Sequence, residues 1–481
     1  MRDDHVAAAR TSAGAGARGG AESCGGGLTQ RMPEAGLFAP YRRSMMHEER
    51  ATRMHPTDAR GRRVALLTYG TRGDVEPFIA LAAGLQRAGF APRLAAPAVF
   101  ESLAQVHRVE FDPLPGDPAQ LARDLVAQAG TSWPRMVRAV SRFVVPLGAQ
   151  VFRKAVDCAA GADLMVHSFL MTQAGHEIAL RQHIPSVSAQ FFPVFAPTSA
   201  FPSVVSPDMP LGGFYRRLTH GFVTQVFWQG SRLVYGSVRR EAPGLPSLSG
   251  WPFAARPAMR PRLLFAFSRY VVPPPADWAG NAEVTGYWPL GPREGWRPAA
   301  DLERFLESGP PPVYIGLGSG GEAAGAAWVR HALSALEEIG ARGVLGLGSG
   351  SVEPGSLPET TIAVRETPHA WLFPRVAAVV HHGGAGTTGA GLTAGRVTVV
   401  VPTTSDQPFW GRRVYALGVG PKPIPVRRLS ARNLAEAISV ATSDRAMMAR
   451  AEDLGRRLCS EDGVGAAVGR IALMLGKKPT T

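Results

Sequence analysis

The sequence predicts an α/β protein in which two domains each carry a parallel sheet. Short apolar runs alternate with helical patterns in two stretches of the chain, and a Pro-rich passage separates them. Strands of a parallel sheet are buried on both faces, so they read as continuous apolar runs. At 481 residues the chain also exceeds the usual size of one domain and suits two.

The first domain is expected over residues 62–290. It begins with an apolar run at 64–69 and a helical pattern at 75–88, which Gly89 would end. The remaining strands of this domain are expected at 93–96, 109–112, 164–167 and 185–189.

Over residues 191–228 aromatic, Pro and Gly residues replace this rhythm. Long apolar segments without periodicity are typical either of loops that cover a core or of the wall of a pocket for a lipophilic ligand. The sequence leaves both alternatives open.

A Pro-rich linker is predicted at residues 291–311, and a second domain at 312–481. Residues 326–339 have a helical pattern, and residues from 430 onward are interpreted as two closing helices. The strands of this domain are expected at 313–318, 343–347, 361–364, 376–380 and 397–401.

Several classes of protein are disfavoured by composition. Residues 1–61 are rich in Gly, Ala, Arg and Ser without periodicity, which predicts a disordered tail. The net charge of +14 comes mainly from dispersed Arg and includes no basic motif interleaved with aromatics, so no nucleic-acid partner is expected.

The cysteines Cys24, Cys158 and Cys459 are odd in number and irregular in spacing, which argues against a disulfide framework and a metal cage. No run approaches the ~18–20 apolar residues that cross a bilayer. We therefore expect a cytoplasmic protein whose contact with a membrane, where it occurs, is peripheral.

The most informative segment is the loop His381-His-Gly-Gly-Ala-Gly-Thr-Thr388, between a predicted strand and a predicted helix. Open parallel sheets bind ligands at the C-terminal ends of their strands. Glycines let the backbone approach an anion, and a helix start offers free N–H groups and a partial positive charge. The loop lacks the Gly-Lys-Ser/Thr ending of a P-loop, so it predicts a diphosphate site without nucleotide hydrolysis. A tight turn with two core histidines is the alternative.

After the next strand, Asp406 and Gln407 stand together at a predicted helix start, where they suit sugar hydroxyls. Alternatively, Ser405 or Asp406 only caps that helix. In the first domain Asp74 follows the Gly70-Thr-Arg-Gly turn. This carboxylate either caps the next helix or acts as general base toward an acceptor hydroxyl.

Residues 316–321 formally match Gly-x-Gly-x-x-Gly, the pattern of a nicotinamide-dependent oxidoreductase. The ribose-binding acid of that pattern belongs at the tip of a second strand. Here Glu337 and Glu338 fall inside the expected helix instead. We therefore interpret Gly318 and Ser319 as a second edge that faces phosphate, and keep the oxidoreductase as an alternative function.

Four segments resemble the GT-B glycosyltransferases, in particular the sterol glucosyltransferases and the vancomycin-group antibiotic glycosyltransferases. The resemblance extends from about residue 62 to the C-terminus. It rests on Gly70-Thr-Arg-Gly-Asp-Val-Glu-Pro77, Val284-Thr-Gly-Tyr-Trp288, His381-His-Gly-Gly-Ala-Gly-Thr-Thr388 and Asp406-Gln-Pro-Phe-Trp410.

This resemblance implies two Rossmann-like domains that face each other across a cleft. It also implies an inverting, metal-independent transfer of a hexose from a nucleoside-diphosphate sugar, with UDP-glucose the expected donor. The acceptor would be a hydroxyl of a lipophilic molecule such as a sterol, polyketide, terpenoid or glycolipid. No cofactor is expected beside the nucleotide sugar. A non-catalytic binding protein of the same fold is the further alternative.

By position, the resemblance makes Asp74 the catalytic base. Ala390 stands where plant small-molecule glycosyltransferases carry a ribose-binding Glu, eight residues after His382, so ribose recognition stays unassigned. The other implied contacts are His382, Gly384, Ala385, Gly386 and Thr387 to the diphosphate, beside Ser319; Asp406 and Gln407 to the sugar; and the backbone at Thr367, Pro368 and His369 to the nucleotide base.

Overall fold

The computed structural model describes the chain from residue 61 to residue 476 with gaps, and every described residue belongs to one compact unit, His55–Thr481. Most of the tail predicted at residues 1–61 lies outside the described residues, as does Ser319 of the predicted site. None of the described helices is both long and apolar enough to cross a membrane. The described residues are 61–121, 124, 142, 144–241, 248, 250–254, 260–278, 280–316, 325–347, 357–365 and 367–476.

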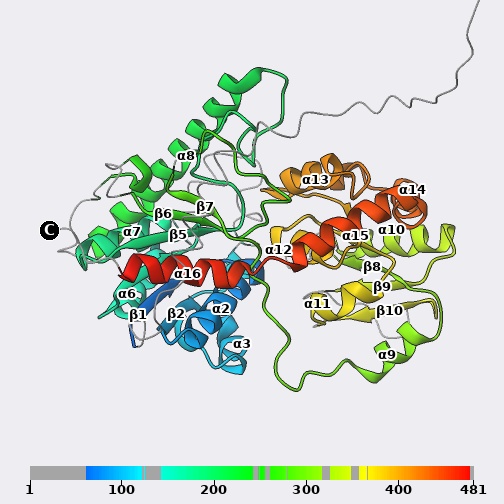
Figure 1. Cartoon of the computed structure of the whole chain (residues 1–481), viewed down its shortest axis with the longest axis horizontal. Helices are drawn as coiled ribbons and strands as arrows, with labels where there is room; N and C mark the ends of the chain where they lie inside the picture. Colours follow the sequence, from blue (N-terminus) through cyan, green and yellow to red (C-terminus); the bar gives the residue numbers. More distant parts are fainter. Residues whose placement is uncertain are drawn as a thin grey trace, which may run out of the picture. The chain divides into compact units, whose positions relative to one another are not determined.

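A seven-stranded parallel sheet organises the first domain (Figure 1), with the strand order β3-β2-β1-β4-β5-β6-β7. The order reverses at β1, and the C-terminal edge at such a reversal is where open parallel sheets bind ligands. The strands are β1 (Arg63–Leu67), β2 (Ala91–Pro97), β3 (Glu110–Leu114), β4 (Leu164–His167), β5 (Ser186–Gln190), β6 (Arg262–Phe265) and β7 (Ala282–Val284).

Helices cover both faces of this sheet because successive strand residues point to opposite faces. Val64 and Leu66 of β1 pack with α2, whereas Ala65 and Leu67 pack with α6 and α7. Gly89, which has φ 88°, ends α2 as the sequence predicts. The helices are α2 (Arg72–Arg87), η2 (Ala98–Phe100), α3 (Glu101–Val106), α6 (Val145–Ala159), α7 (Thr172–Arg181), α8 (Gly212–Glu241) and η4 (Pro252–Ala254).

The irregular segment predicted at residues 191–228 is wrong for its second half. A helix of 30 residues, α8, begins at Gly212. Its apolar side chains occur on more than one face, because part of the helix packs on the core and part is exposed. This distribution hides the helical period on which the sequence-based expectation depends.

A five-stranded parallel sheet organises the second domain, with the order β10-β9-β8-β11-β12. All five strands agree with the sequence prediction to within two residues. In the first sheet, the sequence does not predict β6 and β7, which have 4 and 3 residues. The strands are β8 (Val313–Gly316), β9 (Gly343–Gly346), β10 (Thr361–Val364), β11 (Ala378–His381) and β12 (Val397–Val400).

Two features of the second half differ from the expected organisation. The predicted linker contains a helix, α9 (Ala300–Glu307), whose Leu302 packs in a core with Tyr314 and Phe373. Three helices close the chain instead of two. The other helices are α10 (Gly325–Glu338), α11 (His369–Leu372), η7 (Phe373–Arg375), α12 (Ala385–Thr393), α13 (Gln407–Ala416), η8 (Val426–Arg428), α14 (Ala431–Ser443), α15 (Arg445–Cys459) and α16 (Gly463–Gly476).

The last helix, α16, returns to the first domain and lies alongside α2 (Figure 1). Val468 and Ile471 of α16 belong to the same core as Val75 and Phe78 of α2. A Cβ at Gly84 of α2 would lie 2.4 Å from a methyl group of Val464, so this close approach needs glycine. The predicted boundary at residue 290 stays a prediction, but the C-terminal helix completes the first core.

Candidate functional site

The glycine-rich loop after β11 forms the strand–turn–helix junction that the sequence predicts. Gly383 has φ 91°, and a Cβ there would lie 2.7 Å from Val400 and 3.1 Å from the Gln407 carbonyl oxygen, so only glycine fits. Gly384 is the N-cap of α12, without a side-chain cap. The first amides of the helix, at Ala385, Gly386 and Thr387, therefore have no partner within the helix and offer an anion-binding turn.

The two threonines of this loop differ in their surroundings. The Thr388 hydroxyl is buried and donates to the Gly384 carbonyl oxygen at 2.8 Å, so it stabilises the turn. Thr387, one residue earlier, is half-buried. A Cβ built at Gly386 meets nothing within 4 Å. This first turn of α12 thus has free space beside it.

Three histidines surround the loop, and burial lowers the pKa of each. His381 is fully buried, and its Nδ1 accepts a hydrogen bond from the Gly383 amide at 2.9 Å, so the unprotonated Nδ1 helps to fix the turn. Burial lowers the pKa of His382 and of His369 to about 4. All three rings are therefore neutral at pH 7, and each can donate one N–H.

His382 faces the loop that would hold a diphosphate. A Cβ at Gly384 would lie only 2.6 Å from its Nε2. Its Nδ1 is buried and has no hydrogen-bond partner among the described residues. Because a neutral imidazole donates through one nitrogen only, His382 suits a phosphate oxygen without adding a charge.

Asp74 occupies the third position of α2, where one carboxylate oxygen caps the helix start. Its Oδ2 accepts from the Thr71 amide at 2.8 Å and from the Thr71 hydroxyl at 3.1 Å. Among the described residues, no donor bonds to the other oxygen, Oδ1. Gly70 has φ 148°, and a Cβ there would lie 2.3 Å from Oδ2, so glycine is needed to seat this carboxylate.

The acidity of Asp74 suits a base that works near neutral pH. Burial is the largest cause and raises its pKa to about 6, the bonds from Thr71 oppose it, and the charge of Asp406 raises it further. Asp406 belongs to the second domain, so the acidity of Asp74 depends on both domains. The structure shows the predicted cap and leaves the role as base a prediction.

Asp406 and Gln407 are partly engaged by their own loop. The Trp410 indole N–H donates to Asp406 Oδ2 at 2.8 Å, which fixes the carboxylate one turn below. Gln407 Oε1 accepts from the Thr403 amide at 2.8 Å and from the Thr403 hydroxyl at 2.7 Å. Its amide NH2 group takes no part in these bonds. The cap proposed for Asp406 is absent, because its side chain makes no N-cap bond.

The predicted base-binding segment lies beside the histidines. The His369 ring stacks on Phe373, with ring centroids 4.3 Å apart, and lies edge-on to Tyr314. The charges of Arg72 and His382 both contribute to the lowered pKa of His369. Arg72 starts α2 of the first domain, and its Nε donates to Glu76 of the same helix at 2.6 Å.

Three residues near these loops have no role in the prediction from sequence. Trp410 and Arg72 stand inside the quoted motifs but had no assigned role. The third, Arg413 of α13, donates from Nε and Nη2 to the Val271 carbonyl oxygen of the first domain at 3.0 and 2.6 Å. Only the four-residue spacing of Asp406 and Trp410, which stacks them on one helix face, was visible beforehand.

The motif at residues 284–288 packs against α12, the helix that follows the glycine-rich loop. A Cβ at Gly389 of α12 would lie 2.6 Å from the Tyr287 ring, so ring and helix are in close contact. Trp288 packs in the core of the first domain and donates its indole N–H to the Thr285 hydroxyl at 3.0 Å. The segment thus links the first core to α12.

Aromatic rings gather beyond the ends of β4 and β5. Phe169 follows β4 and packs against Phe192, Phe195 and Phe227, with centroids 4.2 to 5.5 Å apart. Phe195 has φ 62°, an uncommon conformation for a bulky residue that the packing must hold. The rings form one continuous wall at the same edge as Asp74. Phe195 is buried in a core cluster, and Phe169, Phe192 and Phe227 pack against that cluster.

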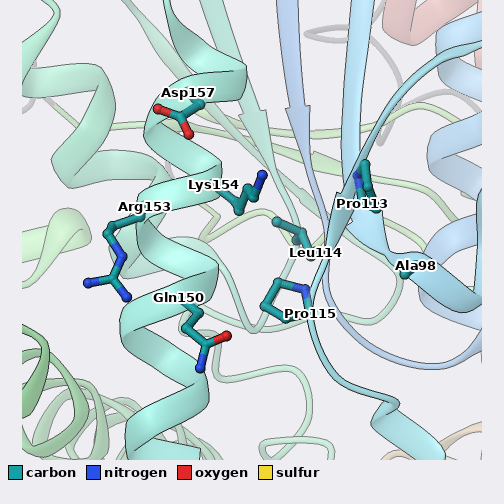
Figure 2. A pocket seen from close by; sticks show the side chains of 8 residues that line it. All are labelled: Ala98, Pro113, Leu114, Pro115, Gln150, Arg153, Lys154 and Asp157. Atoms are coloured by element: carbon teal, nitrogen blue, oxygen red, sulfur yellow. The ribbon is translucent and has the colours of Figure 1, made fainter.

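Two hollows lie apart from the predicted site residues. A hollow of about 430 Å³ beside α6 contains none of them, and Figure 2 shows its side chains. Another, of about 460 Å³, lies between α15 and the segment that follows α13. The first hollow is lined by Ala98, Pro113, Leu114, Pro115, Gln150, Arg153, Lys154 and Asp157.

Comparisons with known proteins agree with these loops. Residues 64–195 match the glycosyltransferase family 28 N-terminal domain, and residues 331–466 match the erythromycin biosynthesis protein CIII-like C-terminal domain. The chain is 36% identical over 423 residues to O-mycaminosyltylonolide 6-deoxyallosyltransferase of Streptomyces fradiae, covering 84% of this chain and 95% of that protein. The chain belongs to the GT-B glycosyltransferases.

Sterol 3-beta-glucosyltransferase of Emericella nidulans is 34% identical over 441 residues, which are 88% of this chain and 31% of that protein. The chain thus spans about a third of the length of this fungal relative. The solved structure of glycosyltransferase VinC in complex with dTDP has the same fold, with a TM-score of 0.61 and 17% identity over 86% of this chain and 99% of that one. These findings confirm the predicted family and fold and remove the nicotinamide-dependent oxidoreductase.

Proposed function

We propose that this glycosyltransferase transfers a hexose from a nucleoside-diphosphate sugar, with UDP-glucose as the expected donor, to a hydroxyl of a lipophilic acceptor. The observation that carries the proposal is the first turn of α12, whose uncapped amides adjoin the neutral ring of His382. Asp74 of the first domain and Asp406 of the loop expected to hold the sugar are the other proposed parts of the site. The transfer uses no cofactor beside the nucleotide sugar.

The reaction is a single displacement with inversion. Asp74 Oδ1 takes the proton of the acceptor hydroxyl while that oxygen attacks the anomeric carbon. The bond from the anomeric carbon to the diphosphate oxygen breaks, and its electron pair leaves with the nucleoside diphosphate. Because attack and departure occur on opposite faces, an α-linked donor gives a β-linked product. A pKa of about 6 lets Asp74 accept the proton near neutral pH and release it afterwards.

The leaving group is stabilised by the first turn of α12. Amides of Ala385, Gly386 and Thr387, together with the helix dipole and one N–H of neutral His382, meet the charge that develops on the diphosphate. These donors are preorganised by the bonds of Gly383 and Thr388, and the proposed transfer requires no metal ion. Asp406 and Gln407 hold the sugar, and the backbone of Thr367–His369 meets the base.

The proposal extends to the chemical class of the acceptor. The aromatic wall that includes Phe169 and Phe192 suits an extended apolar molecule such as a sterol, polyketide, terpenoid or glycolipid. Relatives named for a sterol and for a macrolide intermediate support this class. Peripheral contact with a membrane belongs to the same proposal, because lipophilic acceptors reside there.

A donor screen followed by a transfer assay tests the proposal. A nucleotide that binds raises the melting temperature through mass action, and UDP and UDP-glucose are expected to give the largest shifts. The best donor is then incubated with a sterol and a macrolide aglycone, and products are identified by mass. Binding without transfer to either class would favour the non-catalytic alternative, and stabilisation by no nucleotide would remove the proposal.

A further inference from the structure

Helix α8 presents a row of large apolar side chains that no described residue covers. Leu211 precedes the helix, and Phe214, Leu218, Phe222 and Val226 follow at four-residue spacing, which places them along one face. Each is more than half exposed, and Phe214 reaches 82%. Single exposed apolar residues are ordinary, but a continuous row of this kind marks a contact surface.

The opposite face of α8 already anchors the helix. Thr219 and His220 are buried, the Thr219 hydroxyl accepts from the Ser203 amide at 2.9 Å, and a His220 ring nitrogen lies 3.0 Å from the Phe201 carbonyl oxygen. Tyr235 and Val238 are buried in the core with α6. The exposed row is therefore not needed to hold α8 in place.

The charge of α8 indicates what would cover this row. Its sequence contains five arginines and a single glutamate, within a chain of net charge +14. Two of these arginines, Arg216 and Arg217, lie within the span of the row. Arg216 pairs with Asp208 at 3.8 Å and Arg217 with Asp277 at 3.1 Å, and the Arg217 side chain is still 53% exposed. An apolar row with phenylalanines beside arginines is the composition of a helix that lies in the interface of an anionic membrane.

A second copy of the chain fits this face less well. A stable dimer usually buries about 800 Å² on each partner. One row of five side chains along a single helix is narrow for that purpose. Two such faces would also bring their arginines together, whereas an anionic surface is complementary to them.

We propose that the exposed face of α8, defined by Leu211, Phe214, Leu218, Phe222 and Val226, docks the enzyme on an anionic lipid bilayer. The apolar side chains enter the acyl boundary, and the arginines meet the phosphate headgroups. None of these five residues belongs to the donor loops, so docking can be measured without catalysis. Its use in acceptor delivery rests on the proposed function.

Vesicle flotation with the full chain tests docking without any substrate. The wild type is expected to bind vesicles of phosphatidylcholine with phosphatidylglycerol at least about tenfold more tightly than vesicles of phosphatidylcholine alone, and less tightly at high salt. The variant Phe214→Asp/Phe222→Asp should lose about tenfold or more of this binding. Because both side chains are exposed, its melting temperature should be unchanged.

A matched control carries the same charge change elsewhere. Val106 of α3 and Val440 of α14 are 47% and 41% exposed, and Val106→Asp/Val440→Asp should keep wild-type binding. Equal losses in the two double variants, or no binding by the wild type to either vesicle, would overturn the proposal. So would a wild-type dimer, measured by light scattering, that only the α8 variant dissociates.

A separate transfer assay tests whether docking delivers the acceptor to the enzyme. The α8 variant should keep transfer to a detergent-dispersed acceptor and lose about tenfold with the same acceptor embedded in anionic vesicles. Equal rates with vesicle-embedded acceptor would overturn acceptor delivery. If no acceptor is ever glycosylated, the proposed function fails, whereas flotation still decides whether α8 docks.

Discussion

Two helices begin at the C-terminal edges of the two sheets, and they use their first turns in opposite ways. In α2 the third residue is Asp74, whose carboxylate bonds to the Thr71 amide and closes the helix start. In α12 the N-cap is Gly384 without a side-chain cap, and the third residue is Thr387. One helix start is occupied by the chain's own anion, and the other is left open.

This difference separates two tasks that share one physical cause. A helix N-terminus stabilises negative charge. In α2 that charge is a base held in place, and burial keeps its pKa at about 6 in spite of the helix and the bonds from Thr71. In α12 the same stabilisation is free for the charge that leaves with the diphosphate.

The largest expected effect comes from removing the charge that closes α2. Asp74→Asn keeps an oxygen that can accept from Thr71 but cannot take a proton, so kcat should fall by ~10²–10⁴-fold. Donor affinity, measured by calorimetry, should stay unchanged because the carboxylate does not hold the donor. Turnover within a factor of about two of wild type would remove Asp74 as the base.

The second-largest effect is expected when a carboxylate is placed in the first turn of α12, as Asp74 is in α2. Thr387→Asp places a carboxylate at the position that Asp74 occupies in α2, and should weaken nucleoside-diphosphate binding on the order of 100-fold by repulsion and by self-capping. Thr387→Ala loses one hydroxyl and should cost only about 2- to 10-fold. Calorimetry with UDP separates the two, and equal affinities would mean that α12 does not receive the diphosphate.

A smaller effect is expected from a substitution at Gly70, which lies against the Asp74 carboxylate. Gly70→Ala puts a Cβ 2.3 Å from Asp74 Oδ2 at a φ of 148°, so it should destabilise the fold by about 1–3 kcal/mol and slow transfer. Gly73→Ala is the matched control, since a Cβ there meets only the Thr71 hydroxyl at 3.9 Å. Urea unfolding measures both, and a loss of stability in Gly73→Ala as large as in Gly70→Ala would contradict this role of Gly70.

The smallest effect concerns pH. A base works in its deprotonated form, so kcat should fall about tenfold per unit below a midpoint near pH 6. The negative charge of Asp406 disfavours a second negative charge on Asp74 and so raises its pKa. Asp406→Asn should therefore move the midpoint to lower pH, whatever it does to donor affinity. A midpoint that moves upward would contradict this effect of Asp406 on Asp74.

The sequence predicts the parts of this molecule that repeat a local pattern. Strands such as β4 and β12 are short runs buried on both faces, and His381–Thr388 places glycines where the turn needs them. Helices with apolar residues on both a buried and an exposed face are not predicted by such a pattern. Helix α8 carries apolar residues on both its buried and its exposed face, so the 3.6-residue period is obscured.

Within the site, the sequence predicts which residue types are present but not which contacts each of them makes. The sequence allows Asp74 to be either a cap or a base, because the pattern does not show that Oδ2 caps the helix while Oδ1 has no bonded partner among the described residues. The return of α16 to α2 and the bond from Arg413 to Val271 depend on long-range packing. No periodicity in the chain encodes such contacts.

The anomeric configuration of the first product tests the central claim most directly. Wild-type enzyme is incubated with an α-linked nucleotide sugar and a lipophilic acceptor, and the proton coupling at the anomeric carbon of the product is read by NMR. The account predicts a β-linked product, because Asp74 activates the acceptor on the face opposite the diphosphate held by α12. An α-linked product would contradict it.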